Sequence, residues 1–237
     1  MKLINRLFRK LFYSGGYGVH SPFVFRLIKY VIGEKKCAYY AYDDMEMLRR
    51  KLKHFHETRT VEKQTISKKK GELLFRLANE FQPRLILQVG AMQGMAALYM
   101  TAYSKKTRCQ LWESNDLQAD LTEKVLKMAA TTQVDLRRGK YKSLFVQELF
   151  DVKQVDCFYF HLSDDMEELQ EVLQHCFSSA RTDAVLIIDD IRVCKAMKTL
   201  WKELIQSEKV TVSIDLYDIG ILLFNKKYNK KHYTVYY

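Results

Sequence analysis

The sequence predicts an α/β fold in which helices cover both faces of a mostly parallel sheet of seven strands. Short and almost continuous apolar runs alternate with stretches of helical periodicity, which is typical of a parallel sheet buried on both faces. Only 2 prolines and 9 glycines occur in 237 residues, and this favours long regular elements over a many-turned all-β architecture. The last two apolar runs are separated only by a tight turn at Gly220, so they predict an antiparallel hairpin at the edge of the sheet.

Seven segments are expected to form the strands, because each is a short apolar run bounded by turn residues or by a helical pattern. Pro83 is expected to end a helix at 72–81 just before the first strand. Between later strands, residues 116–130 and 166–177 have the periodicity of amphipathic helices. The predicted strands are LILQV (85–89), CQLWE (109–113), VDLRR (134–138), VDCFYF (155–160), AVLIID (184–189), VTVSIDLYD (210–218) and ILLFNKK (221–227).

Residues 1–71 predict a basic helical extension in front of an α/β domain at 72–237. In residues 3–12, apolar side chains recur at helical spacing with Lys and Arg opposite them, which predicts a short amphipathic helix. Such a helix can dock on its own domain or lie on a membrane surface. Ser21 and Pro22 begin a second helix, FVFRLIKYVI, with serine at the cap and proline at the first helical position.

Composition excludes several classes of protein. Hydrophobic residues make up 48% and charged residues 28%, as in an ordinary globular protein, so intrinsic disorder and collagen-like repeats are excluded. The 5 cysteines are odd in number and include no C-x-x-C pair, so we expect reduced cysteines and neither a disulfide framework nor a zinc site. No run approaches the ~18 apolar residues of a membrane-spanning helix, and the first residues lack the features of a signal peptide. We therefore expect a cytoplasmic protein without a transmembrane segment.

The net charge of +11 is concentrated towards the two ends of the chain. Residues 1–80 hold 18 Lys and Arg against 8 Asp and Glu, and residues 226–237 hold 4 Lys and no acid. These ends are either a solvated surface or a contact for a phosphate-rich partner or an anionic membrane. Because acidic residues interrupt the basic front and no aromatic stacking platform accompanies it, strong nucleic-acid binding is not expected. The oligomeric state stays open, with a homodimer as one alternative.

The loop after the first predicted strand is a candidate ligand site, since ligands of open α/β sheets bind outside the carboxyl ends of the strands. This loop, GAMQG at 90–94, has two glycines that let the backbone approach a ligand closely. It lacks the G-x-G-x-x-G of a dinucleotide site and the G-K-[ST] of a triphosphate site. Glu113 ends the second strand 23 residues after Gly90, where an acid accepts hydrogen bonds from ribose hydroxyls. The alternative is an acid placed at a helix N-terminus.

Five segments in this order resemble the class I S-adenosylmethionine (SAM)-dependent methyltransferases, and within them the small O-methyltransferase-like proteins. They are LILQVGAMQG, QLWES, VDCFYFHLSDD, AVLIIDDI and SIDLYDIGILLFNKK, and the resemblance covers about 72–226. GVHSPFVF at 18–25, followed by a helix, is similar to a bacterial branch of this family. The resemblance implies a Rossmann-like methyltransferase fold with SAM as its cofactor.

The resemblance also implies a set of cofactor-binding residues. Glu113 would hold the ribose, the two glycines of the loop would admit the methionine half, and two residues after the third strand would lie beside adenine. The full implied set is Gln88, Gly90, Ala91, Met92, Gly94, Glu113, Ser114, Lys140 and Tyr141.

The chain departs from the family's usual pattern at three positions. An acid is usual where Gln88 stands, a small polar residue where Met92 stands, and an aspartate where His161 stands. Each of these positions would touch the amino-acid end of the cofactor or the transferred methyl group.

The catalytic candidates are His161, which directly follows the fourth predicted strand, and Asp189, which ends the fifth. An imidazole can take a proton from a hydroxyl that attacks the sulfonium methyl, but a histidine that merely fills the strand end gives the same pattern. In metal-assisted O-methyltransferases, acids at such strand ends hold a divalent cation, and oxygen ligands suit magnesium. Helix N-capping explains Asp164 and Asp190 equally well, so these two are only weak metal candidates and a divalent metal is not expected.

Two functions are compatible with these features. The first is methyl transfer from SAM to an oxygen or nitrogen of a small-molecule acceptor, with residues 1–71 as a lid over that acceptor. The second is a catalytically degenerate methyltransferase fold that serves as a binding or scaffolding module. The changed glycine loop favours the second, whereas Glu113 and the acidic strand ends favour the first, and we expect the enzyme. Methylation of RNA through the basic residues is the weakest hypothesis.

Overall fold

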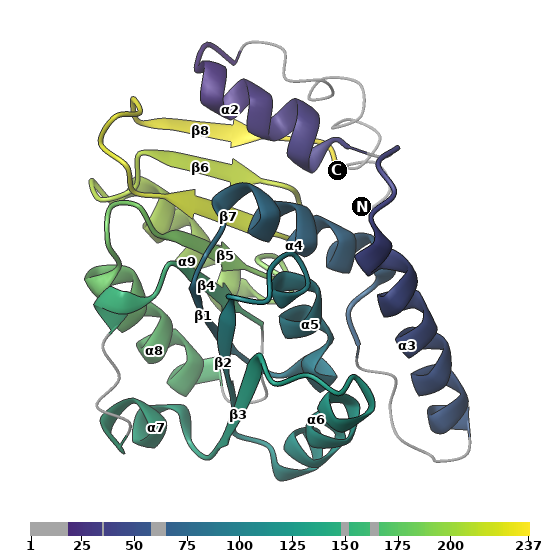
Figure 1. The fold of residues 1–237 in the computed structure, drawn as a ribbon. Helices are drawn as coiled ribbons and strands as arrows, with labels where there is room; N and C mark the ends of the chain where they lie inside the picture. The colour runs from purple at the N-terminus through teal and green to yellow at the C-terminus, as the bar shows by residue number, and fades with distance from the viewer. Residues whose placement is uncertain (1–18, 35, 58–64, 148–151, 162–165) are drawn as a thin grey trace.

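The computed structural model describes residues 19–34, 36–57, 65–147, 152–161 and 166–237. In this part of the chain a sheet forms the middle of three layers, and helices pack against both of its faces (Figure 1). Each face has its own cluster of buried apolar side chains, because successive strand residues point to opposite faces and nearly all of them are apolar. The α/β prediction is confirmed.

The sheet is built from β1 (Leu85–Val89), β2 (Arg108–Glu113), β3 (Val134–Arg138), β4 (Cys157–Phe160), β5 (Val185–Ile188), β6 (Val212–Asp215), β7 (Gly220–Leu223) and β8 (Lys231–Thr234). The described strands form one eight-stranded sheet in the order β3-β2-β1-β4-β5-β7-β6-β8. From β3 to β5 all neighbours are parallel, β7 is antiparallel to β5 and β6, and β8 is parallel to β6. Strand order reverses between β1 and β4, and this reversal fixes where a ligand site is expected.

The closing hairpin forms as predicted, but it does not lie at the edge of the sheet. Its turn is closed by a hydrogen bond from the Leu216 amide to the Ile219 carbonyl at 2.9 Å. Outside it, β8 adds an eighth strand, so the prediction of seven strands was one short and the edge position was wrong. Because Lys231 and His232 are exposed, no apolar run marks this strand in the sequence.

Helices of both faces complete the layers. On one face lie α2 (Pro22–Arg26), the π-helix η1 (Leu27–Ile32), α3 (Tyr40–Glu57), α4 (Lys68–Phe81), α5 (Met95–Thr101) and α6 (Asp116–Met128). On the other face lie α7 (Tyr141–Gln147), α8 (Met166–Ser179) and α9 (Lys195–Gln206). Two 3-10 turns, η2 (Met92–Gly94) and η3 (Val152–Gln154), precede α5 and β4.

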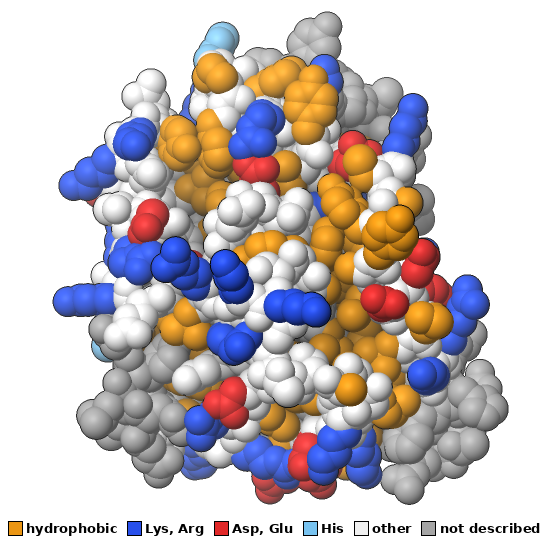
Figure 2. Space-filling model, in the orientation of Figure 1, with side chains coloured by type: hydrophobic (Ala, Val, Ile, Leu, Met, Phe, Trp, Pro, Cys, Tyr) orange, Lys and Arg blue, Asp and Glu red, His pale blue; other side chains and the backbone are white. Residues whose placement is uncertain are grey.

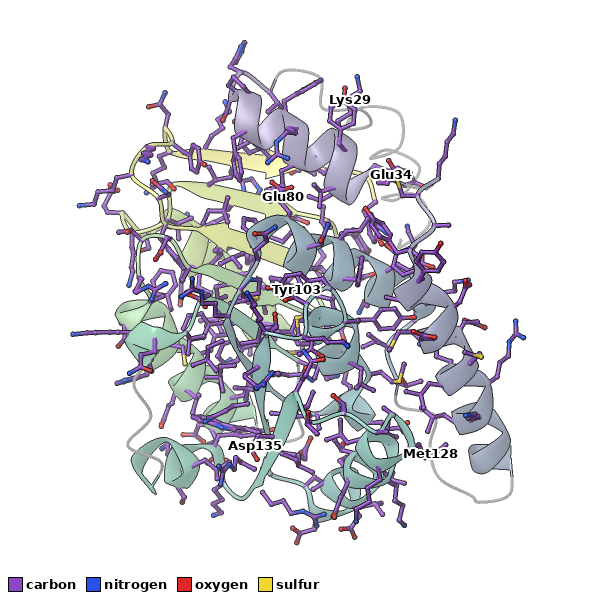
Figure 3. All side chains as sticks on the ribbon, viewed as in Figure 1. Lys29, Glu34, Glu80, Tyr103, Met128 and Asp135 are labelled. Atoms are coloured by element: carbon purple, nitrogen blue, oxygen red, sulfur yellow. The ribbon has the colours of Figure 1, made fainter. Side chains whose placement is uncertain are left out.

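The expected extension shares its core with the α/β domain. Ser21 caps α2 as predicted, since its hydroxyl oxygen accepts a hydrogen bond from the Val24 amide at 3.4 Å. Arg26 pairs with Glu80 of α4, and Figure 3 shows Glu80 on the side of α4 that faces α2. Helix α4 starts four residues before the predicted helix and crosses the boundary between residues 71 and 72. The lid role stays a prediction, and the amphipathic helix at 3–12 lies outside the described residues.

On the face drawn in Figure 2, the described residues mix positive and negative side chains. Lys and Arg side chains are spread over the face drawn in Figure 2, with Asp and Glu among them, and do not gather in one groove of that face. None of the helices described is both long and apolar enough to cross a bilayer. The expectation of weak nucleic-acid binding stays a prediction.

Helices α4 and α5 approach so closely that only glycine fits at residue 71. An added Cβ at Gly71 would lie 2.3 Å from the ring of Tyr99, whose side chain is buried. We expect Gly71→Ala to lower the free energy of unfolding by about 1–3 kcal/mol through overpacking, although alanine is the better helix former. Urea denaturation measures the loss. In a Tyr99→Leu background the same change should be close to neutral, and an equal loss there would contradict the contact.

Candidate active site

The candidate site lies where the parallel strands end beside the reversal of strand order. The loop at 90–94 follows β1, Glu113 ends β2, His161 follows β4 and Asp189 follows β5. The His161 amide donates to the Val89 carbonyl at 2.9 Å, so the exits of β1 and β4 are held together. A Cβ on Gly90 would lie 2.7 Å from the His161 carbonyl oxygen, and therefore only glycine fits there.

The glycine loop at 90–94 is a tight turn that hydrogen bonds from the Gln88 side chain stabilise. Gly90 and Gly94 have φ of 86° and 75°, and Met92 and Gln93 also adopt left-handed conformations. The fully buried Gln88 donates from Nε2 to the carbonyls of Gly90 at 2.8 Å and of Ala91 at 3.1 Å. A carboxylate cannot donate a hydrogen bond, so an amide, not the acid usual at this position, holds this loop.

Glu113 connects the glycine loop to the start of α6. Its Oε2 accepts the Ala91 amide and its Oε1 accepts the Asn115 amide, each at 2.8 Å. The side chain is buried, and burial raises the pKa of its carboxyl against the lowering effect of these backbone bonds. The Ser114 amide also donates to this carboxylate, so three of its about four lone-pair sites are engaged and one remains for a further donor. Glu113 therefore accepts hydrogen bonds both from the glycine loop and from the residue that caps the N-terminus of α6.

Beside this loop, His161, Asp189 and Asp190 form a compact cluster that Lys70 joins from α4. The Lys70 Nζ lies 2.5 Å from Asp189 Oδ1 and 3.1 Å from Asp190 Oδ1. His161 Nδ1 lies 3.3 Å from Asp189 Oδ2 and 3.9 Å from Asp190 Oδ2. The neighbouring parallel strands β4 and β5 bring together His161 and Asp189, the two catalytic candidates of the sequence analysis.

Asp189 is the centre of this cluster and is completely buried. Its Oδ2 accepts the Tyr159 hydroxyl at 3.0 Å, and its Oδ1 accepts the Asp190 amide at 2.9 Å. Burial raises the pKa of Asp189, but the hydrogen bond from His161 and the charge of Lys70 outweigh it and lower the pKa to about 2. Conversely, burial lowers the pKa of Lys70, and the two aspartates outweigh this effect and raise it. Asp189 is therefore an anion and Lys70 a cation.

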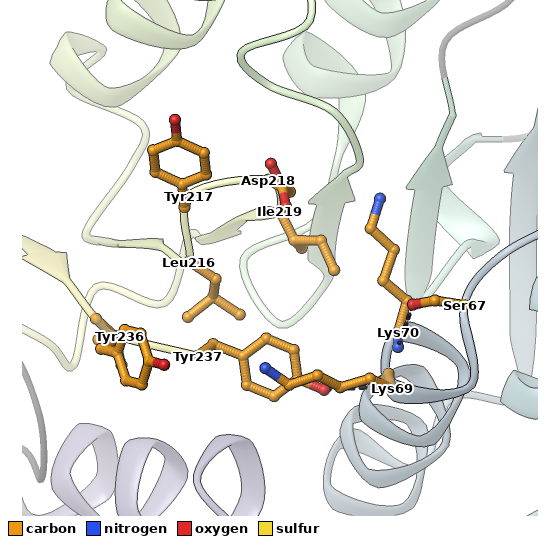
Figure 4. Close-up of a pocket in the computed structure, with 10 residues that line it drawn as sticks. Ser67, Lys69, Lys70, Leu216, Tyr217, Asp218, Ile219, Tyr236 and Tyr237 are labelled. Carbon is orange, nitrogen blue, oxygen red and sulfur yellow. Dashed lines mark hydrogen bonds between the residues drawn. The ribbon is translucent and has the colours of Figure 1, made fainter. Parts of the chain in front are cut away.

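A cavity of about 210 Å³ adjoins this cluster through Lys70, which lines it (Figure 4). Its walls come from the start of α4, from the turn between β6 and β7 and from the segment after β8. The Tyr237 hydroxyl donates to the Lys69 carbonyl at 2.6 Å, and the Lys69 ammonium lies 4.0 Å from the centre of the Tyr237 ring. The remaining lining residues are Ser67, Leu216, Tyr217, Asp218, Ile219, Val235 and Tyr236.

Comparison with known proteins gives the fold. No family model matches the sequence, and no curated protein matches it. Solved structures do match. The O-methyltransferase TomG from Streptomyces achromogenes, involved in tomaymycin synthesis and solved with SAM, aligns over 80% of this chain and 91% of its own, at 16% identity and a TM-score of 0.61. An O-methyltransferase from Bacillus cereus, solved with S-adenosylhomocysteine (SAH), aligns over 83% and 96%, at 15% identity and a TM-score of 0.61.

The fold is that of the class I SAM-dependent O-methyltransferases. Within this methyltransferase fold, the other residues expected at the site differ in solvent exposure. Ser114 is half-buried beside Glu113, and Lys140 is exposed after β3. Tyr141 is completely buried at the start of α7, in the same apolar cluster as Trp112. Asp164 lies outside the described residues. Cofactor contacts for these residues stay predictions.

The sequence analysis did not identify Lys70, which reaches Asp189 and Asp190 of the candidate site from a helix more than one hundred residues earlier in the sequence. It stands in the run Lys68-Lys69-Lys70, which has the pattern of a solvated surface. One signal was present: residue 70 falls on the same helical stripe as the buried Leu73, Leu74 and Leu77. A lysine on an apolar stripe needs an acidic partner, and the acidic strand ends supply it.

Proposed function

We propose that this protein is a SAM-dependent methyltransferase that acts on an oxygen or nitrogen of a small-molecule acceptor. One observation carries the proposal: at the reversal of strand order, a buried acid on β2 is hydrogen-bonded to a glycine loop, and a histidine–aspartate pair lies at the ends of β4 and β5. The two solved O-methyltransferases described above contain SAM or SAH, and their likeness in fold supports the same cofactor.

The residues present fit such a cofactor. Gly90 adopts a left-handed backbone conformation that lets the loop turn tightly after β1, and Glu113 keeps one acceptor site for a ribose hydroxyl. Within the described residues, the buried Oε1 of Gln88 accepts no hydrogen bond, and a buried orphan acceptor suits the ammonium of the methionine half. When bound, the sulfonium supplies a methyl group that is already activated, so the protein's main work is alignment.

His161 is the group proposed to move a proton. Asp189 Oδ2 faces Nδ1 of His161, which favours the tautomer with the proton on Nδ1 and a lone pair on Nε2. Nε2 then takes the proton of an acceptor hydroxyl or amine while the new bond to the methyl carbon forms. Asp189 holds the ring and stabilises the imidazolium. His161 would hold the acceptor's proton, and the bound sulfonium would supply the leaving group.

The cavity beside Lys70 is proposed to hold the acceptor. Its volume of about 210 Å³ is below the usual range for drug-sized ligands, which supports a small acceptor. Apolar side chains such as Leu216 and Ile219 share its wall with tyrosines and with Lys70, so an acceptor with one apolar face and one oxygen or nitrogen would be matched.

One observation favours the second function, a binding module without turnover. Met92 and Gln93 adopt left-handed conformations, and Gln93 is completely buried. The side chains of Met92 and Gln93 occupy space that a loop of small residues would leave open. A protein that binds SAH but transfers no methyl group to catechols, phenols or amines would support this alternative.

Calorimetric titration with SAH tests the proposal, using Glu113→Gln. This change keeps the size of the side chain but removes its charge and half of its acceptor capacity. We expect the affinity for SAH to fall by about 1.5–3 kcal/mol, which is the range for hydrogen bonds to a charged group. Asp116→Asn, a neighbouring exposed acid in the first turn of α6, is the matched control and should leave the affinity unchanged. An unchanged affinity in Glu113→Gln would refute the ribose role, and no binding by the parent protein at millimolar SAH would refute the cofactor.

A further inference from the structure

The cluster of His161, Asp189 and Asp190 has the composition of a divalent metal site. Each residue offers one ligand atom, and these atoms lie within 4.8 Å of one another. Two carboxylates and an imidazole would suit several divalent ions. Whether a metal fits depends on what else touches these ligand atoms.

The lone pairs of Asp189 are already in use. Its Oδ1 accepts from Lys70 Nζ at 2.5 Å and from the Asp190 amide at 2.9 Å. Its Oδ2 accepts from the Tyr159 hydroxyl at 3.0 Å and lies 3.3 Å from His161 Nδ1. An ionised carboxylate has about four lone-pair sites, and here four donors face them. No acceptor site on Asp189 is left for a metal.

Lys70 also occupies the position that a bridging cation would take. Its ammonium contacts Asp189 and Asp190 together, and its side chain is only 21% exposed. The ammonium and the two carboxylates sum to one negative charge, whereas the carboxylates alone would carry two. Deletion of the ammonium would therefore both free a lone pair and strengthen the attraction for a divalent ion.

We infer that Lys70 is a tethered cation that replaces a divalent metal at the His161–Asp189–Asp190 cluster. The residues do not fit a metal while the lysine is in place. Because Lys70 also lines the cavity, its ammonium, which has three N–H donors and two carboxylate partners, keeps one donor for an acceptor oxygen held there. This last point rests on the proposed function; the replacement of the metal does not.

Titration of the full chain with Mn²⁺, with free Mn²⁺ followed by electron paramagnetic resonance, tests the inference without any need for turnover. The parent protein should show no site that depends on the cluster. Lys70→Met, which keeps the length of the side chain and removes its charge, should gain one site with an affinity at least about tenfold above any background binding of Mn²⁺ by the parent. Lys70→Met with Asp190→Asn should lose this gain, which would assign the bound ion to the cluster.

Two lysine variants serve as controls. Lys69→Met removes a lysine from the same helical turn and the same cavity wall, but one whose ammonium lies against the Tyr237 ring, so no site should appear. Lys70→Arg keeps the charge and should also show none. If Lys70→Met does not fold by circular dichroism, Lys70→Gln takes its place. The inference is overturned if the parent binds Mn²⁺ and Asp190→Asn abolishes that binding, or if a folded Lys70 variant without the charge gains no site.

Discussion

Asp189→Ala is expected to lower the free energy of unfolding by about 3–5 kcal/mol, the usual cost of removing one partner from a buried ion pair. Asp189 is completely buried and is faced by Lys70, Tyr159, His161 and the Asp190 amide, so its loss leaves the buried Tyr159 hydroxyl without its acceptor and the Lys70 ammonium with Asp190 alone. Urea denaturation of parent and variant at neutral pH measures the difference.

Two further variants separate the buried pair from a general effect of charge. Asp190→Ala should cost less, because the Asp190 side chain is 33% exposed and water can replace its contacts. Asp189→Ala combined with Lys70→Met should recover part of the loss, since the ammonium that lost its closer carboxylate is removed as well. If Asp189→Ala costs no more than Asp190→Ala, the buried pair is not the source of the stability.

His161→Ala is expected to reduce methyl transfer by about 10²–10⁴-fold, the usual contribution of a positioned general base. The assay uses labelled SAM with a panel of catechols, phenols and amines. Since the proton acceptor is removed and the glycine loop is not, SAH affinity should change little, so the loss should appear in turnover.

His175→Ala is the matched control for this variant, because His175 is exposed on α8 on the other face of the sheet. It should leave turnover unchanged. Turnover that is indifferent to His161→Ala would remove His161 from the catalytic residues and leave alignment alone to explain the rate.

The layout of the parallel sheet could be predicted because its strands are short apolar runs. The runs at 85–89 and 134–138 match β1 and β3 residue for residue, and β2 starts one residue earlier than predicted. By contrast, β8 contains the exposed Lys231 and His232 and has no apolar run. It is a strand because it pairs with β6, and this contact in space leaves no pattern in the sequence. An edge strand with one solvent-exposed face has few apolar residues, so its sequence pattern is weak.

The candidate site could be predicted only in part, for a related reason. The positions of His161 and Asp189 follow from topology, since carboxyl ends of neighbouring parallel strands meet at one edge of a sheet. The contact with Lys70 depends instead on how α4 packs over the sheet. The helical stripe of residue 70 marks it as facing inward, but it does not indicate which acids Lys70 meets. The amide role of Gln88 was equally hidden, because a resemblance to an acid at that position says nothing about which backbone carbonyls need a donor.

The first turn of α4 contains three consecutive lysines at the end of the helix where the macrodipole is positive, an arrangement that opposes helix formation. Asp189 and Asp190 offset this repulsion for Lys70, and the Ser67 hydroxyl oxygen accepts the Lys70 amide at 3.2 Å. The winding of this turn is therefore coupled to the ionic state of the strand ends. Fraying of α4 at its start would withdraw the ammonium from the cavity wall, so amide-hydrogen protection in this turn and occupancy of the cavity should rise and fall together.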